Sequence, residues 1–335
     1  MRLSEKIAVG YAYGTSLLSY MVDGPARPFS ATFAVTNRCN LRCEYCNCPF
    51  IDPSNLALPQ IETMFDRLQQ MGVRRLGLAG GEPTLRADLG EIVEMAKARK
   101  FFVSINSNLT LYSRHPERLW QGDLIYTSLD GDAAAHNAAR GERAFEGVLE
   151  AIEDLIGRGK PVIAICVVTE HSIGQSEFLL AQAERLGFRL HFQPQCVDTE
   201  IVRGEVSGAL SNESIRQFWR GLGEQKRKGR PIVSSTPYLE LLSKWEDFSV
   251  SAYYDADTRC PAGHGYIYID PQGKAWACAY TKGLTKPVDL LSQDWQEAWT
   301  KDNPCTRCTV GPMLEFNLLF QRPLSAIREG IRTYG

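Results

Sequence analysis

The sequence predicts an α/β fold: a partial (β/α)6 parallel barrel, similar to a TIM barrel, followed by a small C-terminal domain that contains a β-hairpin. Two observations predict it. Between residues 29 and 196, short apolar runs alternate with segments of helical periodicity, which is typical of βαβ units and a parallel sheet. Six such units are fewer than the eight of a complete TIM barrel. After residue 256, two short strands around a Pro/Gly turn predict the hairpin.

Length, composition and charge indicate a globular protein with metal-binding cysteines. The chain has 335 residues, 44% of them hydrophobic and 23% charged, which suits one barrel-sized domain and a smaller module. A formal net charge of −2 gives no reason to expect nucleic acid or an anionic membrane as a partner, so we expect no nucleic acid. The ten cysteines fall mainly in two clusters with metal-like spacing, which in an intracellular enzyme favours metal over disulfides. Cys166 and Cys196 are expected to be packed thiols.

Residues 1–28 are predicted to form an amphipathic helix. Apolar and small residues recur at helical spacing at Leu3, Ile7, Gly14, Leu18 and Met21. The apolar part is interrupted by glycines and tyrosines and is too short to span a bilayer. We expect this helix to pack against the barrel of a cytoplasmic protein. Contact with a membrane surface or a lipid substrate is the less favoured alternative.

The barrel strands are predicted from apolar or β-branched runs bounded by turn residues. These runs cover residues 29–35, 74–79, 101–105, 123–129, 162–168 and 189–193. Helices are predicted over residues 58–71, 87–99, 145–156 and 177–186. Ligands of such sheets bind at the carboxyl ends of the strands, so the polar motifs that follow the strands are expected to form one site.

Residues 197–255 are predicted to be a helical connector that covers the mouth of the barrel. Helices are expected over residues 212–221 and 238–245, and the basic run 224–230 is expected to be a solvated face. The tail, residues 313–335, begins with an apolar stretch that is expected to pack on the barrel.

Three cysteines, Cys39, Cys43 and Cys46, follow the first predicted strand with the spacing C-x3-C-x2-C. Soft thiolates at such spacing suit zinc or an iron–sulfur cluster. A structural zinc site normally has four ligands, whereas this local set stops at three unless Cys48 or a distant group joins it. Three cysteines on a four-iron cluster would leave one iron open to a small molecule. This loop is therefore predicted to be the reaction centre.

This motif, with Tyr45 as the aromatic residue before its last cysteine, resembles the signature of the radical S-adenosylmethionine (SAM) enzymes. The resemblance implies that Cys39, Cys43 and Cys46 hold a 4Fe–4S cluster whose open iron binds SAM. It also implies that the reduced cluster cleaves SAM to a 5′-deoxyadenosyl radical. Two further motifs follow in the family's order: Gly-Gly-Glu-Pro at 80–83, and Ser-Leu-Asp-Gly at 128–131 with His136 and Arg140 after it.

The resemblance further implies which residues contact SAM. Tyr45 would lie near the adenine, Glu82 would accept hydrogen bonds from the SAM ammonium, and Arg140 would suit its carboxylate. The other implied contacts are Gly80, Gly81, Ser107, Asn108 and Ser128. The family often has Thr-Asn-Gly where this chain has Ser107-Asn108, so the glycine is missing here.

The motif at residues 128–141 gives less specific predictions for its other residues. Asn137 replaces the family's usual aspartate after His136. His136 is predicted to be structural rather than a general base, and Asp130 serves either the substrate or the turn. No residue is predicted as the proton donor or the radical quencher.

A second cysteine set, Cys260, Cys278, Cys305 and Cys308, lies in the predicted C-terminal domain, residues 256–312. Four thiols on a hairpin and a C-x2-C pair could hold zinc. Their spacing also resembles the auxiliary-cluster domain of the SPASM/Twitch subfamilies. No cysteine follows Cys308, so the resemblance implies a Twitch-type domain with one auxiliary 4Fe–4S cluster.

The expected function is that of a radical SAM enzyme that abstracts hydrogen from an organic, partly apolar small molecule, followed by oxidation or rearrangement. The auxiliary cluster, saturated by four cysteines, would relay electrons. A peptide maturase that modifies a ribosomally made precursor is the alternative, and a zinc-bound scaffold without activity is a remote one. A reductase such as flavodoxin or ferredoxin is the expected protein partner.

Overall fold

The computed structural model describes residues 3–195, 210–249, 252–253, 260–281, 285–299, 303, 305, 307–308 and 310–321. Its centre is a parallel sheet in which the first six strands lie in chain order. These strands are β1 (Ser30–Thr36), β2 (Arg75–Gly80), β3 (Phe102–Ser107), β4 (Leu124–Ser128), β5 (Val162–Val168) and β6 (Arg189–Pro194). The predicted partial barrel of six parallel strands is therefore confirmed. Among these six strands, burial is most complete in β5, where six of seven residues are buried, whereas in β2 only Leu76 and Leu78 are.

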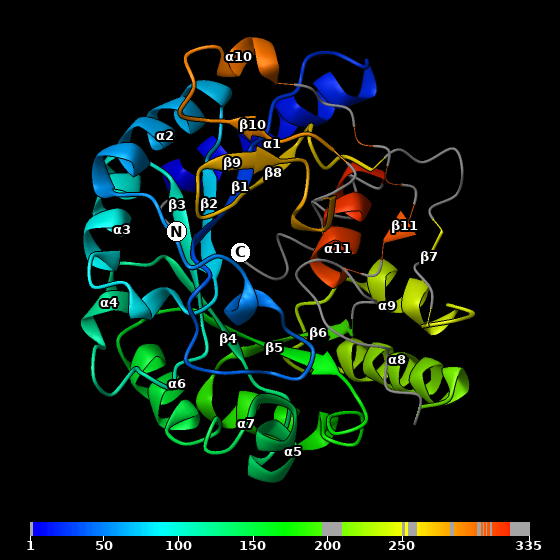
Figure 1. Ribbon diagram of the computed structural model, residues 1–335. Helices are drawn as coiled ribbons and strands as arrows, with labels where there is room; N and C mark the ends of the chain where they lie inside the picture. Colours follow the sequence, from blue (N-terminus) through cyan, green and yellow to red (C-terminus); the bar gives the residue numbers. More distant parts are fainter. Residues whose placement is uncertain are drawn as a thin grey trace.

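Helices cover the outside of this sheet (Figure 1). They are α2 (Leu58–Met71), α3 (Leu89–Ala98), α4 (Glu117–Trp120), α5 (Ala133–Arg140), α6 (Val148–Gly157) and α7 (Ser176–Leu186). Two short 3-10 helices, η1 (Cys48–Phe50) and η2 (Pro83–Leu85), lie instead in the loops that follow β1 and β2. Local sequence sets their ends. The amide of Ala57 donates to the Gln60 side chain at the start of α2, and Gly72 ends it with a φ of 99°.

The predicted connector contains two helices, α8 (Asn212–Arg227) and α9 (Thr236–Ser243). Serine side chains cap both, because Ser211 accepts from the Ser214 amide and Ser235 from the Tyr238 amide. Helix α8 continues through most of the basic run that was expected to be a solvated face. Arg230, just beyond it, forms ion pairs of 2.7 Å with Glu177 and Glu184 of α7. Residues 196–209, which include Cys196, lie outside the described residues.

The C-terminal hairpin is part of the barrel sheet. Its strands β8 (Tyr266–Ile269) and β9 (Lys274–Trp276) are joined by a turn in which Asp270 accepts from two backbone amides. Strand β8 pairs in parallel with β1, so the sheet continues through β9 to β10 (Val288–Asp289). The remaining elements of this region are η3 (Ala279–Thr281), α10 (Trp295–Ala298) and the small sheet of β7 (Ala252–Tyr253) with β11 (Arg307–Cys308).

Helix α11 (Gly311–Gln321) stands at the open side of the barrel, between β6 and β8 (Figure 1). Gly311 lies directly against β6, because a Cβ there would lie 2.6 Å from the Gln193 side chain. Phe316 packs against Tyr266 of β8 with ring centroids 5.6 Å apart. The helix begins two residues before the predicted tail, and it packs on the barrel as expected. Residues 322–335 lie outside the described residues.

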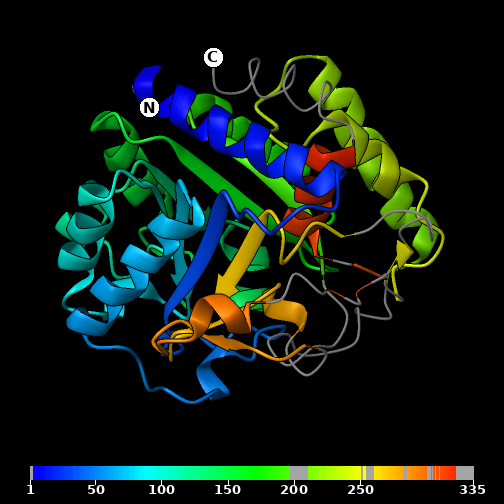
Figure 2. The ribbon, with the colours of Figure 1, turned by 90° about the horizontal axis from the view of Figure 1, so that it is seen from above.

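Helix α1 (Leu3–Met21) lies across the end of the barrel at which the strands begin, opposite the cysteine loop (Figure 2). Its Tyr13 ring contacts Phe29 and Phe320, and its hydroxyl donates to the Leu319 carbonyl at 2.6 Å. The outer face remains apolar and exposed at Ile7, Tyr11, Leu18 and Met21. None of the helices in the described residues is both long and apolar enough to cross a membrane.

Candidate active site

The cysteine loop between β1 and η1 opens on a cavity of about 200 Å3 at the carboxyl ends of the strands. This cavity brings together ten of the eleven residues predicted for the first cluster and SAM: Cys39, Cys43, Tyr45, Cys46, Gly80, Gly81, Ser107, Asn108, Ser128 and Arg140. The exception is Glu82. Residues far apart in the sequence thus meet at one edge of the sheet, as expected for parallel strands.

The donor set of this cavity fits an iron–sulfur cluster. The thiols of Cys39, Cys43 and Cys46 line one cavity, together with that of Cys48 at the start of η1, and soft thiolates are the ligands that such clusters use. A hydrogen bond from Cys48 lowers the pKa of Cys46 to about 6, whereas burial raises the pKa of Cys39 to about 11. Among the described residues, no three His, Cys, Asp or Glu side chains converge as ligands of a single metal ion.

The two glycines of the Gly-Gly-Glu-Pro motif let the cysteine loop lie against the end of β2. The Gly81 amide donates to the Thr36 carbonyl, and the Glu82 amide donates to the Arg38 carbonyl, both at 2.8 Å. A Cβ on Gly81 would lie 2.6 Å from the carbonyl carbon of Arg38. Gly80 has a φ of 114° as well, which favours glycine. The two glycines therefore admit the cysteine loop and also line its cavity, and their contact with SAM stays a prediction.

Glu82 is fully buried, and its carboxylate is not part of the cavity wall. It accepts four hydrogen bonds: from the Thr84 amide and hydroxyl, from the Ser107 hydroxyl at 2.9 Å and from the Asn108 amide at 2.7 Å. Burial raises the pKa of Glu82, and these hydrogen bonds oppose the rise. Glu82 therefore holds two cavity residues in place. Its contact with the SAM ammonium stays a prediction.

Asn108 joins the end of β3 to the cysteine loop. Its side-chain amide donates to Asn40 Oδ1 at 3.0 Å and lies 4.0 Å from the Cys39 sulfur. Leu109 follows with a φ of 60°, in the left-handed region that favours glycine. This is the position at which the family motif has its glycine. A leucine that is only 2% exposed occupies it here.

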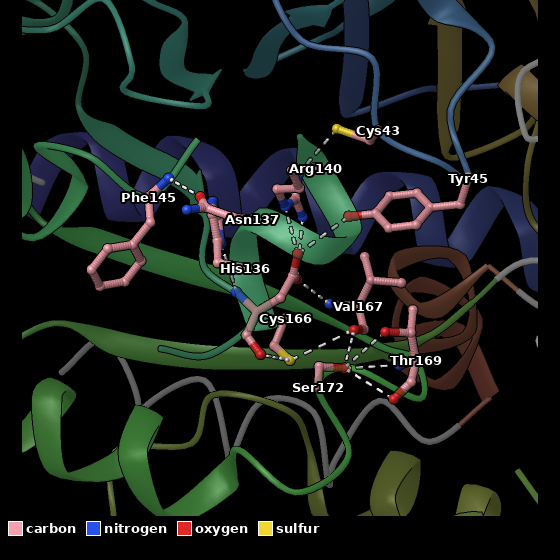
Figure 3. A network of polar contacts seen from close by, with 11 residues as sticks. Cys43, Tyr45, His136, Asn137, Arg140, Phe145, Cys166, Val167, Thr169 and Ser172 are labelled. Atoms are coloured by element: carbon pink, nitrogen blue, oxygen red, sulfur yellow. Dashed lines mark hydrogen bonds and ion pairs between the residues drawn. The ribbon is translucent and has the colours of Figure 1, made fainter. Parts of the chain in front are cut away.

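Arg140 lies beside Cys43 and Tyr45 of the cysteine loop (Figure 3). It forms a buried ion pair with Asp130. Asp130 accepts from Arg140 Nε at 2.5 Å and Nη2 at 3.2 Å, and from the Val167 amide at 2.9 Å. Arg140 Nη1 lies 4.0 Å from the Cys43 sulfur, and the guanidinium lies 5.5 Å from the centre of the Tyr45 ring. Burial tends to lower the pKa of Arg140, but Asp130 raises it well above its usual range.

This network defines roles that the sequence left open. Asp130, predicted to serve either substrate or turn, is the partner of Arg140. His136 accepts from the Asp130 amide at 3.1 Å and is 1% exposed, which supports its predicted structural role (Figure 3). Burial lowers the pKa of His136 to about 4. Two nitrogens of Arg140 are taken by Asp130, and its contact with the SAM carboxylate stays a prediction.

A second and larger cavity, of about 520 Å3, fills the interior of the barrel and is called the lumen below. It shares Asn106, Tyr126 and Ile165 with the smaller cavity, and at its other side it reaches Cys278. Sequence reasoning missed its polar wall residues. The available signal is period-2 alternation: His191 and Gln193 lie two positions apart in β6 and both line the lumen.

The four C-terminal cysteines also come together. Cys260, Cys278 and Cys308 are buried and Cys305 is partly exposed. Burial raises the pKa of Cys308 well above its usual range, and the nearby thiols of Cys278, Cys260 and Cys305 raise it further. Four neighbouring thiols suit the donor set of an iron–sulfur cluster, whereas no three of these described cysteines converge on the position of a single ion such as zinc.

Comparisons with known proteins place the chain in a family. Residues 33–179 match the radical SAM superfamily. The chain is 27% identical to mycofactocin maturase MftC of Mycobacterium ulcerans, over 79% of this chain and 72% of that protein. It is 34% identical to GTP 3′,8-cyclase of Synechococcus elongatus, over 58% of this chain and 65% of that protein.

Two sets of solved structures show the fold. Streptococcus suis SuiB bound to SAM matches with a TM-score of 0.67 at 16% identity, over 83% of this chain and 67% of that one. The enzyme anSMEcpe with bound SAM matches with a TM-score of 0.63 at 16% identity, over 91% of this chain and 99% of that one. The family match over residues 33–179, with the cysteine loop and its cavity, identifies the protein as an enzyme of the radical SAM superfamily, which uses a 4Fe–4S cluster and SAM.

Proposed function

We propose that this radical SAM enzyme modifies a peptide by hydrogen abstraction. The observation that carries the proposal is the lumen, which joins the cavity of the cysteine loop to the auxiliary thiol Cys278. Among the described residues of its wall, the side chains with a permanent charge are Arg75 and Glu315. One cation and one anion suit a nearly neutral peptide segment better than a nucleoside triphosphate, which needs several basic groups.

The relatives support a peptide over the small molecule that we expected first. MftC is named a maturase, SuiB has been solved with its precursor peptide, and anSMEcpe has been solved with a bound peptide. A partly apolar small molecule stays a second candidate, favoured by the apolar part of the wall, which includes Ile163, Val233 and Phe316.

We assign the residues as follows. Cys39, Cys43 and Cys46 would hold the first cluster, and the seven further predicted residues that line its cavity would contact SAM. When bound, the cluster and SAM supply a 5′-deoxyadenosyl radical. The chain's own part is to hold the loop through Gly81 and Asn108, to keep the Arg140 cation beside Cys43, and to enclose the substrate away from water.

We also propose an auxiliary 4Fe–4S cluster on Cys260, Cys278, Cys305 and Cys308 that relays electrons. Cys278 lines the lumen, so a cluster there would adjoin the substrate. A flavodoxin or ferredoxin of the cytoplasm would supply the reducing electron.

The test begins with anaerobic reconstitution of the wild type, of a Cys39→Ala/Cys43→Ala/Cys46→Ala variant and of a Cys260→Ala/Cys278→Ala variant. We expect about eight iron atoms per wild-type chain and about four in each variant, because each four-iron cluster needs its own thiols. With SAM and dithionite, the wild type forms 5′-deoxyadenosine and the triple variant does not.

The peptide is then sought among short open reading frames beside the gene. Each synthetic peptide is incubated with reconstituted enzyme, SAM and dithionite, and its mass is measured. We expect one peptide to change mass in step with 5′-deoxyadenosine formation. If none of these peptides stimulates SAM cleavage but a partly apolar metabolite does, the substrate is the small molecule, which is the second candidate. Zinc in place of iron at the cysteine loop would contradict both.

A further inference from the structure

The lumen contains one buried histidine whose hydrogen-bonding capacity the protein does not use up. His191 projects from β6, lines the lumen and is 8% exposed. Its Nδ1 lies 3.0 Å from the Ser234 hydroxyl, and its ring packs 5.6 Å from the Tyr238 ring. Its Nε2 is buried and has no hydrogen-bond partner among the described residues. Buried polar atoms are rarely left unpaired, so this nitrogen calls for an explanation.

The surroundings of Ser234 decide which nitrogen carries the proton. The Ser234 hydroxyl accepts from the Phe192 amide at 3.3 Å, so its own hydrogen is free to donate to Nδ1 of His191. With Nδ1 as acceptor, the proton lies on Nε2, and the Nε2–H is the one unsatisfied group. With the opposite tautomer, both the serine hydrogen and the Nε2 lone pair would lack partners. The first arrangement leaves fewer buried groups unpaired and is therefore favoured.

The ring is neutral near pH 7, because burial lowers the pKa of His191 to about 4. A neutral N–H donor recognises a neutral acceptor such as an amide carbonyl without the desolvation cost of a buried charge. Gln193, two positions along the same strand, lines the lumen beside it and offers a second amide.

We propose that the Nε2–H of His191 donates a hydrogen bond to an amide carbonyl oxygen of the substrate inside the lumen, and so fixes where the substrate lies relative to the cysteine loop. This inference rests on the proposed function, since it names the group through which the barrel would hold a peptide. It assigns His191 to binding and gives it no part in proton transfer.

The tautomer is tested first, on the reconstituted full-length enzyme. The chain has five histidines, so selective 15N-histidine labelling gives few signals, and a His191→Gln variant identifies those of His191. We expect the spectrum of a neutral ring with its proton on Nε2 between pH 6 and 8. A proton on Nδ1, or a charged ring in that range, would overturn the proposal without touching the peptide assignment.

The ligand is tested with two matched probes in the presence of SAM. N-acetyl-L-tyrosinamide carries amide carbonyls, and 4-ethylphenol has a similar ring without them. We expect the amide to shift the Nε2–H signal of His191, to bind about tenfold more weakly to His191→Phe and to regain most of its affinity in His191→Gln, which keeps a donor near the same place. The phenol should bind the three proteins alike.

The outcomes separate the two proposals. An amide probe that leaves the His191 signal unchanged, or binds His191→Phe as tightly as the wild type, would refute the role of His191. Binding through His191 in an enzyme that modifies no peptide would leave this inference standing and remove the proposed function.

Discussion

The Gly81→Ala substitution tests whether the contact between the glycine motif and the cysteine loop positions the reaction centre. The backbone of Gly81 lies outside the left-handed region, so alanine strains no dihedral angle there. The substitution adds only a methyl group. That group would overlap most with the Arg38 carbonyl oxygen, and it would lie 2.6 Å from the Arg38 carbonyl carbon and 2.7 Å from the Asn37 carbonyl oxygen.

The structure sets the size of the effect. Ordinary van der Waals contact begins near 3.4 Å, so the loop must retreat by about 1 Å. A misplacement of that size costs on the order of 100-fold in rate, and an overpacked contact costs about 1–3 kcal/mol of unfolding free energy. Cys39, Cys43 and Cys46 move together with the loop, so we expect iron still to bind.

The assay compares iron content, thermal unfolding and the rate of 5′-deoxyadenosine formation in Gly81→Ala and in a matched control, Gly221→Ala. Gly221 lies within α8, and nothing lies within 4 Å of an added Cβ. The control should keep its rate and gain about 0.5–1 kcal/mol of stability, since alanine is the better helix former. Wild-type rate and stability in Gly81→Ala would refute the reasoning.

Two further predictions concern buried charge and pH. Asp130→Asn leaves the buried Arg140 without its counter-charge, so we expect a loss of about 3–5 kcal/mol of unfolding free energy in chemical denaturation. The fully exposed pair of Arg143 and Glu146 is screened by solvent, so the control Glu146→Gln should leave the denaturation midpoint unchanged. Equal losses in the two variants would contradict this reasoning. Burial lowers the pKa of His136 and of His191 from 6.5 to about 4, so the unfolded chain takes up protons first as the pH falls. The free energy of unfolding is therefore highest above pH 6.5, and it falls between pH 6.5 and 4 by up to ~3 kcal/mol for each ring. His136→Asn removes one of the two rings, so it should reduce the slope of this free energy against pH. An unchanged slope would contradict the effect of burial on the pKa of His136.

Local patterns in the sequence were enough to predict most of the barrel. Each strand is a short apolar run, and the sheet is parallel, so its order follows from the order of the runs. The cysteine loop was predictable for the same reason, because Cys39, Cys43 and Cys46 lie within eight positions. Ten of the eleven predicted residues then met at one edge, because every motif follows a strand.

Features that depend on long-range convergence were not predictable. The sequence suggests that Asp130 is a turn residue. Its hydrogen bonds with Arg140 and with the Val167 amide form only in the folded chain. Glu82 reads as an exposed ligand, although the ends of β2 and β3 enclose it. Period-2 alternation places His191 and Gln193 on the same face of β6, but both faces carry buried residues, so the alternation alone does not say which face is the lumen side.

The pairing of β1 with β8 also orders events during synthesis. The strand that carries the cysteine loop has one neighbour from the N-terminal half, β2, and one that is translated only at residues 266–269. On the ribosome, β1 is therefore an unprotected sheet edge until most of the chain has emerged. Metal loading of the loop before that moment would act on a barrel that still lacks a wall. A nascent chain stalled before β8 would therefore present that edge to other proteins.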